Sequence, residues 1–319
     1  MNPFMRRVAL VYDPVSGQRS AQRKAAIEQA LAVFRAAGIA AETMETRGAG
    51  DATERARQAV ASGCDTVLAC GGDGTVHEMV QGLVGTEATF GVIPLGTANA
   101  LAASLGLVGR PAKTARLLLD AAPMRISVGR IHYCDLQGNP ASRYFVVAAG
   151  IGADAHVMAR MDARLKRRLG YLLYIIECFR TWATFPFPLF EAALPANGHS
   201  ARVVDVSQLL AVRVRSFGGV LGTLAPGAGL CNGSLNLLAF KTRKRLHYLT
   251  FILSAVAGRH HFNGAVELVE TPSIECRARN GAHESFLVEA DGELLGSLPV
   301  RLEIVPDSLT LLVPAGARP

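Results

Sequence analysis

The stretch Cys70-Gly71-Gly72-Asp73-Gly74-Thr75 decides the fold of the N-terminal half of this chain. The apolar and β-branched run at 66–70 is typical of a buried strand. Apolar residues recur at helical spacing over 76–84, so we expect a helix to begin near Thr75. A glycine turn between a strand and a helix directs backbone N–H groups and the positive end of the helix dipole at its occupant. Phosphate is the usual occupant, and a tight turn capped by Asp73 is the alternative.

The segments around this turn alternate between strands and helices. We expect strands at 7–12, 39–46 and 90–93, and helices at 21–37, 51–62 and 99–105. This alternation predicts an α/β fold with a doubly wound parallel sheet and helices on both faces. Such sheets bind ligands beyond the carboxyl ends of their strands. The turns that follow the expected strands all lie at that edge, and this favours the interpretation that the glycine turn binds phosphate.

After residue 125 the pattern changes to strands joined by turns. The expected strands are 126–134, 143–149, 203–215, 234–240, 266–279 and 286–295, with helical insertions around 155–182 and 244–258. We therefore expect an α/β domain at 1–125 and a β-rich domain at 126–307. The segment 308–319 is a candidate to return to the first domain.

Composition limits the class of protein. A chain of 319 residues suits two domains, and one that is 50% hydrophobic and 18% charged is globular. The net charge of +7 favours acidic partners such as a nucleotide, a nucleic acid or an anionic membrane. An aromatic content of 6% offers no stacking platform for single-stranded nucleic acid, so we expect no nucleic-acid partner.

The six cysteines are scattered without a C-x-x-C pair, which predicts neither a zinc site nor a disulfide framework and fits a reducing compartment. The N-terminus shows no signal-peptide pattern. The apolar segments 169–189 and 249–257 do not make a transmembrane helix, because the first contains charges and prolines and the second is too short. We expect a cytoplasmic protein.

Two motifs together resemble a known family. Gly71-Gly72-Asp73-Gly74-Thr75 alone is shared with NAD kinases and phosphofructokinases. Followed by the segment 94–105 (PLGTANALAASL), it is similar to the catalytic domain of the diacylglycerol kinase and sphingosine kinase superfamily. The resemblance covers nearly the whole chain and continues at 13–17, 150–154, 168–174 and 291–293. It implies an NAD-kinase- and phosphofructokinase-like α/β domain and a C-terminal β-sandwich domain, which enclose a cleft where ATP phosphorylates a lipid hydroxyl.

The resemblance also implies roles for individual residues. It assigns the ATP site to Asp13, Pro14, Ser16, Gly17, Thr46, Gly71, Gly72, Asp73, Gly74, Thr75, Glu78, Thr97 and Asn99. Independently of the resemblance, Asp73 at the end of a strand is a candidate to hold the Mg²⁺ of a nucleotide. The resemblance makes Asp291 the proton acceptor and Glu293 a supporting carboxylate. Independently, Asp291-Gly292 between two apolar runs predicts a carboxylate at a hairpin tip, and phosphoryl transfer needs such a group to take the hydroxyl proton. Asp73 is the rival base, as in sphingosine kinases.

Two further features point to the lipid. Asp154 matches a carboxylate that contacts the lipid head group in sphingosine kinases, and a plain helix N-cap is the alternative. The basic residues Arg160, Arg164, Lys166, Arg167 and Arg168 precede the apolar run 169–176. They predict peripheral contact with an anionic membrane, and a solvated helix face is the alternative.

The chain departs from the family pattern at two places. Asp13 stands where the family has Asn, which brings a negative charge near the expected phosphates. The segment Cys231-Asn232-Gly233-Ser234-Leu235-Asn236 stands where bacterial members have a Mg²⁺ loop ending Asp-Asp-Gly-x-Leu-Asp. Two amides replace carboxylates that a hard cation prefers, so a structural metal is disfavoured there.

The sequence thus predicts an ATP-dependent kinase that phosphorylates a diacylglycerol- or sphingosine-like lipid. One alternative is a soluble NAD-kinase-like phosphotransferase, which the second motif and the basic–apolar run disfavour. The other is a non-catalytic lipid-binding or regulatory protein with the kinase fold, which the presence of Asp73, Asp291 and Glu293 disfavours. The sequence leaves the oligomeric state open, with a homodimer as one candidate.

Overall fold

The computed structural model describes residues 4–14, 20–161, 171–195, 201–217, 222–257, 264–279 and 286–317. The chain divides into two compact units. The first consists of residues 1–127 and 306–319, and the second of residues 128–305. In the described part of the chain, no helix has the length and apolar character that crossing a bilayer requires.

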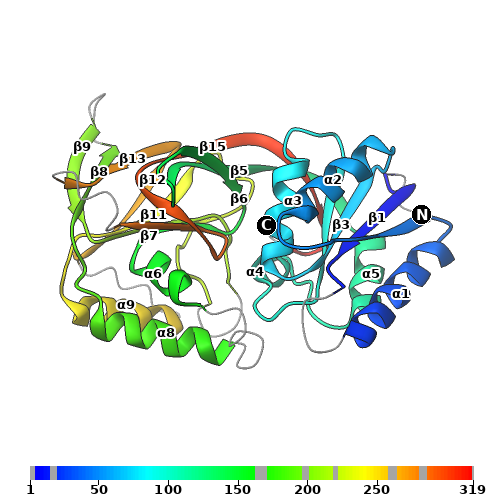
Figure 1. Ribbon diagram of the computed structural model, residues 1–319, viewed down its shortest axis with the longest axis horizontal. Coiled ribbons are helices and arrows are strands. Elements are labelled where there is room, and N and C mark those ends of the chain that lie inside the picture. The colour runs from blue at the N-terminus through cyan, green and yellow to red at the C-terminus, as the bar shows by residue number, and fades with distance from the viewer. Residues whose placement is uncertain are drawn as a thin grey trace. The chain divides into compact units, whose positions relative to one another are not determined.

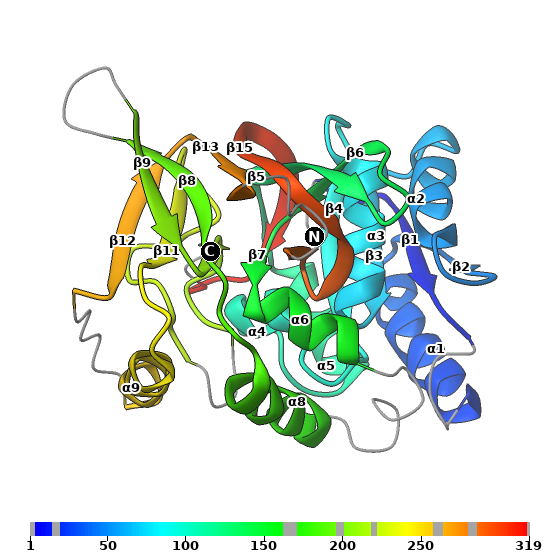
Figure 2. The same ribbon diagram turned by 60° about the vertical axis from the view of Figure 1, so that its left-hand side comes forward.

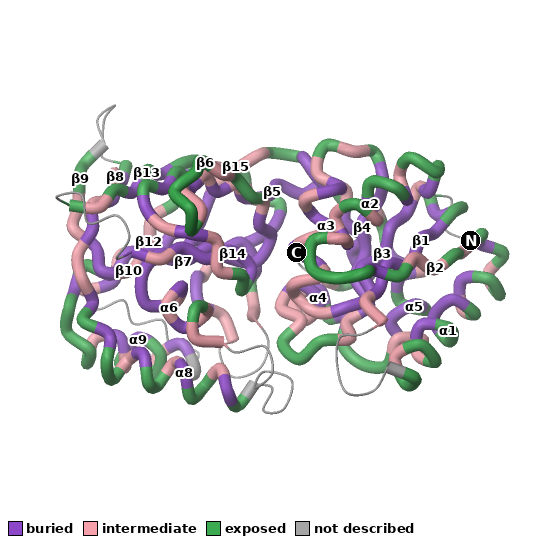
Figure 3. The backbone as a smooth tube through the Cα atoms, in the orientation of Figure 1, coloured by how far each residue is buried: buried purple, intermediate pink, exposed green. Residues whose placement is uncertain are grey.

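The first unit is built on a parallel sheet. Its strands are β1 (Arg7–Tyr12), β2 (Ala40–Glu45), β3 (Thr66–Gly71), β4 (Thr89–Pro94) and the end of β15 (Glu293–Val313). They follow the order β15-β4-β3-β1-β2. Every residue of β3 is buried (Figure 3), as expected of a parallel strand covered on both faces.

Two pairs of helices cover this sheet (Figure 1). The helices α1 (Ser20–Ala36) and α5 (Pro111–Leu119) pack together on one face, and α2 (Asp51–Ala61) and α3 (Asp73–Leu83) pack together on the other. A Cβ on Gly82 of α3 would lie 2.5 Å from the Thr53 carbonyl oxygen of α2, so the close approach of α2 and α3 requires glycine there. The predicted doubly wound α/β fold is confirmed. Helix α5 was not predicted, although Pro111 at its start is a recognised helix signal.

The second unit is mostly antiparallel. Its strands are β5 (Ala122–Asp135), β6 (Pro140–Phe145), β7 (Ala148–Gly152), β8 (Phe190–Pro195), β9 (Ala201–Val206), β10 (Gln208–Val212), β11 (Leu235–Phe240), β12 (Val266–Thr271), β13 (Ser273–Arg277), β14 (Leu287–Ala290) and the start of β15. Hydrogen-bonded neighbours follow the order β12-β11-β10-β7-β14-β15, and β13 pairs with both β15 and β8. Apolar side chains from both groups of strands share one core, in which Phe190 and Phe286 meet edge to face. The predicted β-sandwich class is confirmed.

Several expected strands are interrupted for local reasons. The predicted strand 143–149 is two strands, β6 and β7, because the N–H groups of residues 146–148 donate to the Asp291 carboxylate. The predicted strand 266–279 ends and restarts at Pro272, which has no N–H to donate. Strand β8 was not predicted.

Three described helices belong to the second unit: α6 (Ala153–Arg160), α8 (Tyr171–Thr184) and α9 (Arg245–Val256). Helix α6 lies between β7 and α8 (Figure 2), and α8 contacts α9. They correspond to the two expected helical insertions. The outer sides of α8 and α9 expose large apolar side chains: Leu172, Ile175, Ile176, Phe179, Leu246, Ile252 and Leu253. We call this surface the α8–α9 apolar face.

Candidate functional site

The glycine turn begins where β3 ends. Gly71 is buried, and a Cβ there would lie 2.3 Å from the Thr75 hydroxyl oxygen, so the turn closes only around glycine. Helix α3 starts at Asp73 with Gly72 as its extended N-cap. The start of α3 therefore lies at the carboxyl end of the parallel strands, as the sequence predicted, and places its N–H groups and the positive end of its dipole there.

The second glycine segment packs directly against the first. Leu95 donates its N–H to the Gly71 carbonyl at 2.8 Å. A Cβ on Gly96 would lie 2.6 Å from the Gly72 Cα. The two motifs on which the family resemblance rests therefore form one backbone contact that only glycine allows.

Asp73 ties the two segments together. Its carboxylate accepts the N–H groups of Asn99 at 2.9 Å and Ala100 at 2.7 Å, which begins the short helix α4 (Ala100–Ser104). Asn99 has a left-handed backbone (φ 50°), and its amide both donates to and accepts from the backbone of Gly96. Thr97 is exposed in the same segment. Asp73, Thr97 and Asn99, expected in the nucleotide site, thus share one loop cluster.

A cation that the sequence analysis missed joins this cluster. Arg23 of α1 donates to the carbonyl oxygens of Asp13 and Leu95, each at 3.3 Å. Burial lowers the pKa of the Arg23 guanidinium, and the charge of Asp13 opposes that shift. Asp13 and Pro14 are partly buried at the end of β1, whereas the predicted Ser16 and Gly17 lie outside the described residues. The signal for Arg23 in the sequence was its position in the first turn of α1, where no acidic residue is present.

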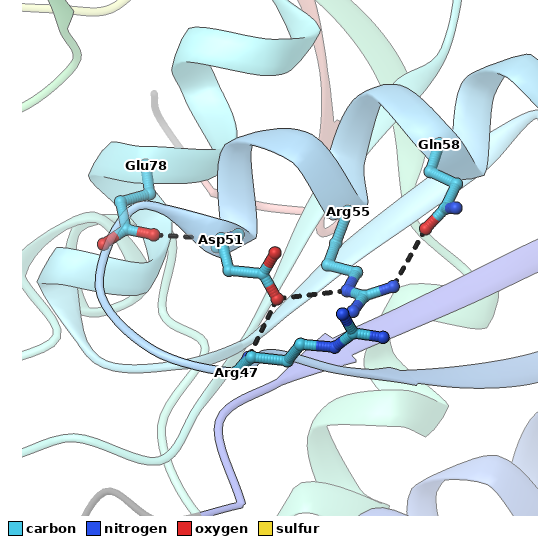
Figure 4. A network of polar contacts seen from close by, with 6 residues as sticks. Arg47, Asp51, Arg55, Gln58 and Glu78 are labelled. Carbon is cyan, nitrogen blue, oxygen red and sulfur yellow. Dashed lines mark hydrogen bonds and ion pairs between the residues drawn. The ribbon is translucent and has the colours of Figure 1, made fainter.

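Two predicted nucleotide contacts take part in the structure of the unit. The Glu78 carboxylate accepts the N–H groups of Gly50 at 2.8 Å and Ala52 at 3.1 Å, and so caps the start of α2. Figure 4 shows Glu78 beside Asp51, whose pKa is lowered by the Arg47 N–H and the Arg55 guanidinium. Thr46 is buried, and its N–H donates to the Tyr12 carbonyl.

In the second unit, Asp291 occupies the tip between β14 and β15. Its backbone is left-handed (φ 50°), and its side chain is buried. Oδ2 accepts the Val146 N–H at 3.0 Å, and Oδ1 accepts the N–H groups of Val147 at 2.8 Å and Ala148 at 3.1 Å. The predicted hairpin tip is confirmed, and the carboxylate is held in one orientation. Glu293 is exposed at the start of β15.

A pair of buried acidic residues lies beside the turn that contains Asp291. Asp154, in the first turn of α6, shares a hydrogen bond with Glu289 of β14, and a Cβ on Gly150 would approach both carboxyl groups within 3 Å. Burial and then the charge of Asp154 raise the pKa of Glu289 well above its ordinary value. Burial also raises the pKa of Asp154. A hydrogen bond between two carboxyl groups requires a proton on one of them, and the raised pKa values favour that protonated form. Glu289 also accepts the Gly292 N–H at 2.9 Å through Oε2.

Helix α8 adds polar groups to this pair. Tyr174 hydrogen-bonds Cys178, and its pKa is raised by burial first and by the charges of Cys178, Asp154 and Glu289. Asp154 thus belongs to a polar cluster in the second unit. Glu289 was missed because its partner Asp154 is distant in sequence, and its place two residues before Asp291 was the only signal.

Comparison with known proteins agrees with this fold. The diacylglycerol kinase catalytic domain matches residues 7–131, and the YegS C-terminal NAD kinase beta sandwich-like domain matches residues 145–313. A diacylglycerol kinase of Bacillus subtilis is 28% identical over 92% of both chains. One of Mycobacterium tuberculosis is 28% identical over 97% of this chain and 95% of its own length.

Solved structures share the fold. A crystal structure of a diacylglycerol kinase from Bacillus anthracis covers 99% of this chain and all of its own, with a TM-score of 0.71 at 19% identity. Yeast NADH kinase covers 98% of this chain and 85% of its own, with a TM-score of 0.55 at 8% identity. The fold is thus that of the diacylglycerol kinase and NAD kinase class. The chain belongs to the diacylglycerol kinase family in which a catalytic domain precedes a YegS-type C-terminal domain. It is a member of a kinase family, and that membership implies the use of ATP.

Proposed function

We propose that this protein is an ATP-dependent lipid kinase that phosphorylates a hydroxyl of a diacylglycerol- or sphingosine-like lipid. The observation that carries the proposal is the backbone contact between Gly72 and Gly96, with Asp73 holding the start of α4. This arrangement gathers N–H groups and a carboxylate at the ligand-binding edge of a parallel sheet, in a chain of the diacylglycerol kinase family.

The first unit supplies the nucleotide contacts. N–H groups at the start of α3 and the Arg23 guanidinium bind the phosphates of ATP. Mg²⁺ arrives with the triphosphate as part of the substrate, and such ions take one or two carboxylates besides the phosphate oxygens. Asp73 fits that need, because its two backbone hydrogen bonds already orient the carboxylate. Arg23 also offsets the charge that Asp13 brings.

The second unit supplies the acceptor chemistry. The lipid hydroxyl oxygen attacks the γ-phosphorus, its proton passes to Asp291, and ADP leaves. The N–H groups of residues 146–148 keep the Asp291 carboxylate in one direction, which supports its assignment as the proton acceptor. Asp154, within the polar cluster, is the proposed contact for the lipid head group, and Glu293 is the supporting carboxylate.

The lipid is reached through peripheral contact with a membrane. The α8–α9 apolar face is flanked by exposed basic residues, Arg180, Arg243, Lys244 and Arg245. Exposed apolar helices bordered by cations suit the interface of an anionic bilayer. Of the basic run predicted for this role, residues 164–168 lie outside the described residues, while Arg160 is partly buried near Thr181 and Thr184.

Phosphoryl transfer to a panel of acceptors tests the proposal. The purified protein is given γ-labelled ATP with mixed micelles of diacylglycerol, monoacylglycerol, sphingosine or ceramide, and with NAD in a parallel reaction. We expect label in at least one lipid and none in NAD. Label in NAD alone supports the NAD-kinase-like alternative. Folded protein that binds ATP and labels nothing supports the non-catalytic alternative.

A further inference from the structure

The side chain of a buried arginine reaches the loop in which the family resemblance places a metal. Arg213, directly after β10, is completely buried and is the largest fully buried side chain among the described residues. Its guanidinium donates to the carbonyl oxygens of Ser234 at 2.6 Å, Leu230 at 2.9 Å and Asn232 at 3.2 Å. Carbonyl oxygens converging from one turn are also the ligands that a hard divalent cation takes.

The remaining groups of this loop do not fit a divalent cation. The Asn232 amide nitrogen donates to the Gly227 carbonyl at 2.7 Å, so this neutral side chain is already engaged in the hydrogen bonding of the loop. Asn236 on β11 is buried, and its amide has no hydrogen-bond partner among the described residues. Glu270, across from Asn236 on β12, is the carboxylate beside Gly227. One exposed carboxylate and neutral amides beside a guanidinium make a poor metal site.

The charge on Arg213 is retained in this setting. Burial lowers the pKa of the guanidinium to about 10, so the side chain is a cation at neutral pH. The planar guanidinium directs several N–H donors at once, and three of its hydrogen bonds reach carbonyls of a single turn. A fixed positive charge and its donors thus do the two things that a bound ion would do: they neutralise converging carbonyl dipoles and hold the turn closed.

We propose that Arg213 is an internal cation that organises residues 230–234 and makes the second unit independent of a structural divalent metal. The Arg213 backbone also connects this loop to the turn that contains Asp291. The Arg213 N–H donates to the Val147 carbonyl oxygen, and the Val147 N–H donates to the Asp291 carboxylate. Two hydrogen bonds thus join the Arg213 backbone to the Asp291 carboxylate, and the guanidinium of the same residue holds the loop, without an exchangeable ion. The proposal concerns stability and metal content, and it stands or falls separately from the lipid-kinase activity.

The first test uses the unaltered protein without nucleotide. After dialysis with and without a chelator, its melting temperature and its content of magnesium and calcium are measured. We expect the same melting temperature in both samples, no increase on adding either ion, and no retained metal. A divalent ion retained in about one copy per chain, or a melting temperature that falls with the chelator, overturns the proposal.

The second test exchanges the arginine for carboxylates. Arg213→Met leaves the three carbonyls without their donor, so we expect a lower melting temperature than for Arg277→Met, which removes an exposed arginine. In Arg213→Met with Asn232→Asp and Asn236→Asp, we expect magnesium or calcium to raise the melting temperature. Equal melting temperatures for Arg213→Met and the parent protein would overturn the proposal, as would an equal response of the parent protein to the ions.

Discussion

Backbone N–H groups position the carboxylates of Asp73 and Asp291, the two aspartates proposed for the chemistry. Asp73 accepts two backbone N–H groups and Asp291 accepts three. Such bonds fix the direction of a carboxylate because the donors belong to the fold itself. Glu289 differs, since one of its oxygens meets the carboxyl group of Asp154. The protein thus contains two kinds of carboxyl site: carboxylates oriented by backbone N–H groups, and a pair of carboxyl groups that share a hydrogen bond.

Asp291→Asn tests the proton acceptor. The amide cannot take the hydroxyl proton, so we expect turnover to fall by about 100-fold to 10,000-fold while ATP binding persists. Stability should fall as well, because the amide nitrogen would face a backbone N–H. Turnover and ATP affinity are measured alongside Asp135→Asn, because this carboxylate also accepts backbone N–H groups and has no assigned role in catalysis. If Asp291→Asn stays active and Asp73→Asn does not, the base is Asp73.

Glu289→Gln tests the shared proton. The pKa values of Glu289 and Asp154 are raised, so the folded state binds more protons than the unfolded state above the ordinary carboxyl range. The stabilisation is complete at low pH and is lost as the pH rises through the folded pKa values. We expect the unfolding free energy of the parent protein to fall more steeply than that of Glu289→Gln between about pH 5 and about pH 8. Denaturant unfolding at both pH values measures this difference, and equal slopes contradict the shared proton.

At the scale of elements, the contact between the two glycine segments is the feature most open to test. In Gly96→Ala the new Cβ would lie 2.6 Å from the Gly72 Cα and 2.7 Å from the Asn99 amide oxygen. We expect a loss of about 1–3 kcal/mol in stability together with weaker ATP binding. Gly48→Ala is the matched control, since its Cβ would meet nothing within 4 Å. Unchanged ATP affinity in Gly96→Ala would show that the contact does not shape the nucleotide site.

The α8–α9 apolar face has a test of its own. Phe179→Ser and Leu253→Ser remove side chains that are 66% and 58% exposed, so folding should be little affected. We expect each to weaken binding to vesicles that contain anionic lipid by about 10-fold to 150-fold, because burying such a side chain is worth about 1.5–3 kcal/mol. Val203→Ser, at an equally exposed apolar residue of β9, is the control. Vesicle sedimentation measures the binding. Equal losses in all three variants would contradict membrane contact through the α8–α9 apolar face.

At the scale of the whole molecule, local patterns were enough to predict the alternating strands and helices of the first unit and the hairpin tip at Asp291. Contacts between residues that are far apart in the sequence could not be predicted from local patterns. The break between β6 and β7 depends on Asp291, more than 140 residues away. Arg23 reaches Leu95, and Glu78 caps a helix that precedes it by more than 20 residues. The spacing of motifs predicted which residues lie at the carboxyl ends of the strands. The tertiary fold determines which of them form structural hydrogen bonds with distant segments.

Lipid-kinase activity is tested most directly by following the γ-phosphate of labelled ATP in the presence of micelles of diacylglycerol, monoacylglycerol, sphingosine or ceramide, with NAD in a parallel reaction. We expect a labelled lipid product that extracts into organic solvent, forms with the parent protein and is absent with Asp73→Asn. Label that appears only in NAD, or no labelled lipid from any acceptor although the folded protein binds ATP, would contradict it.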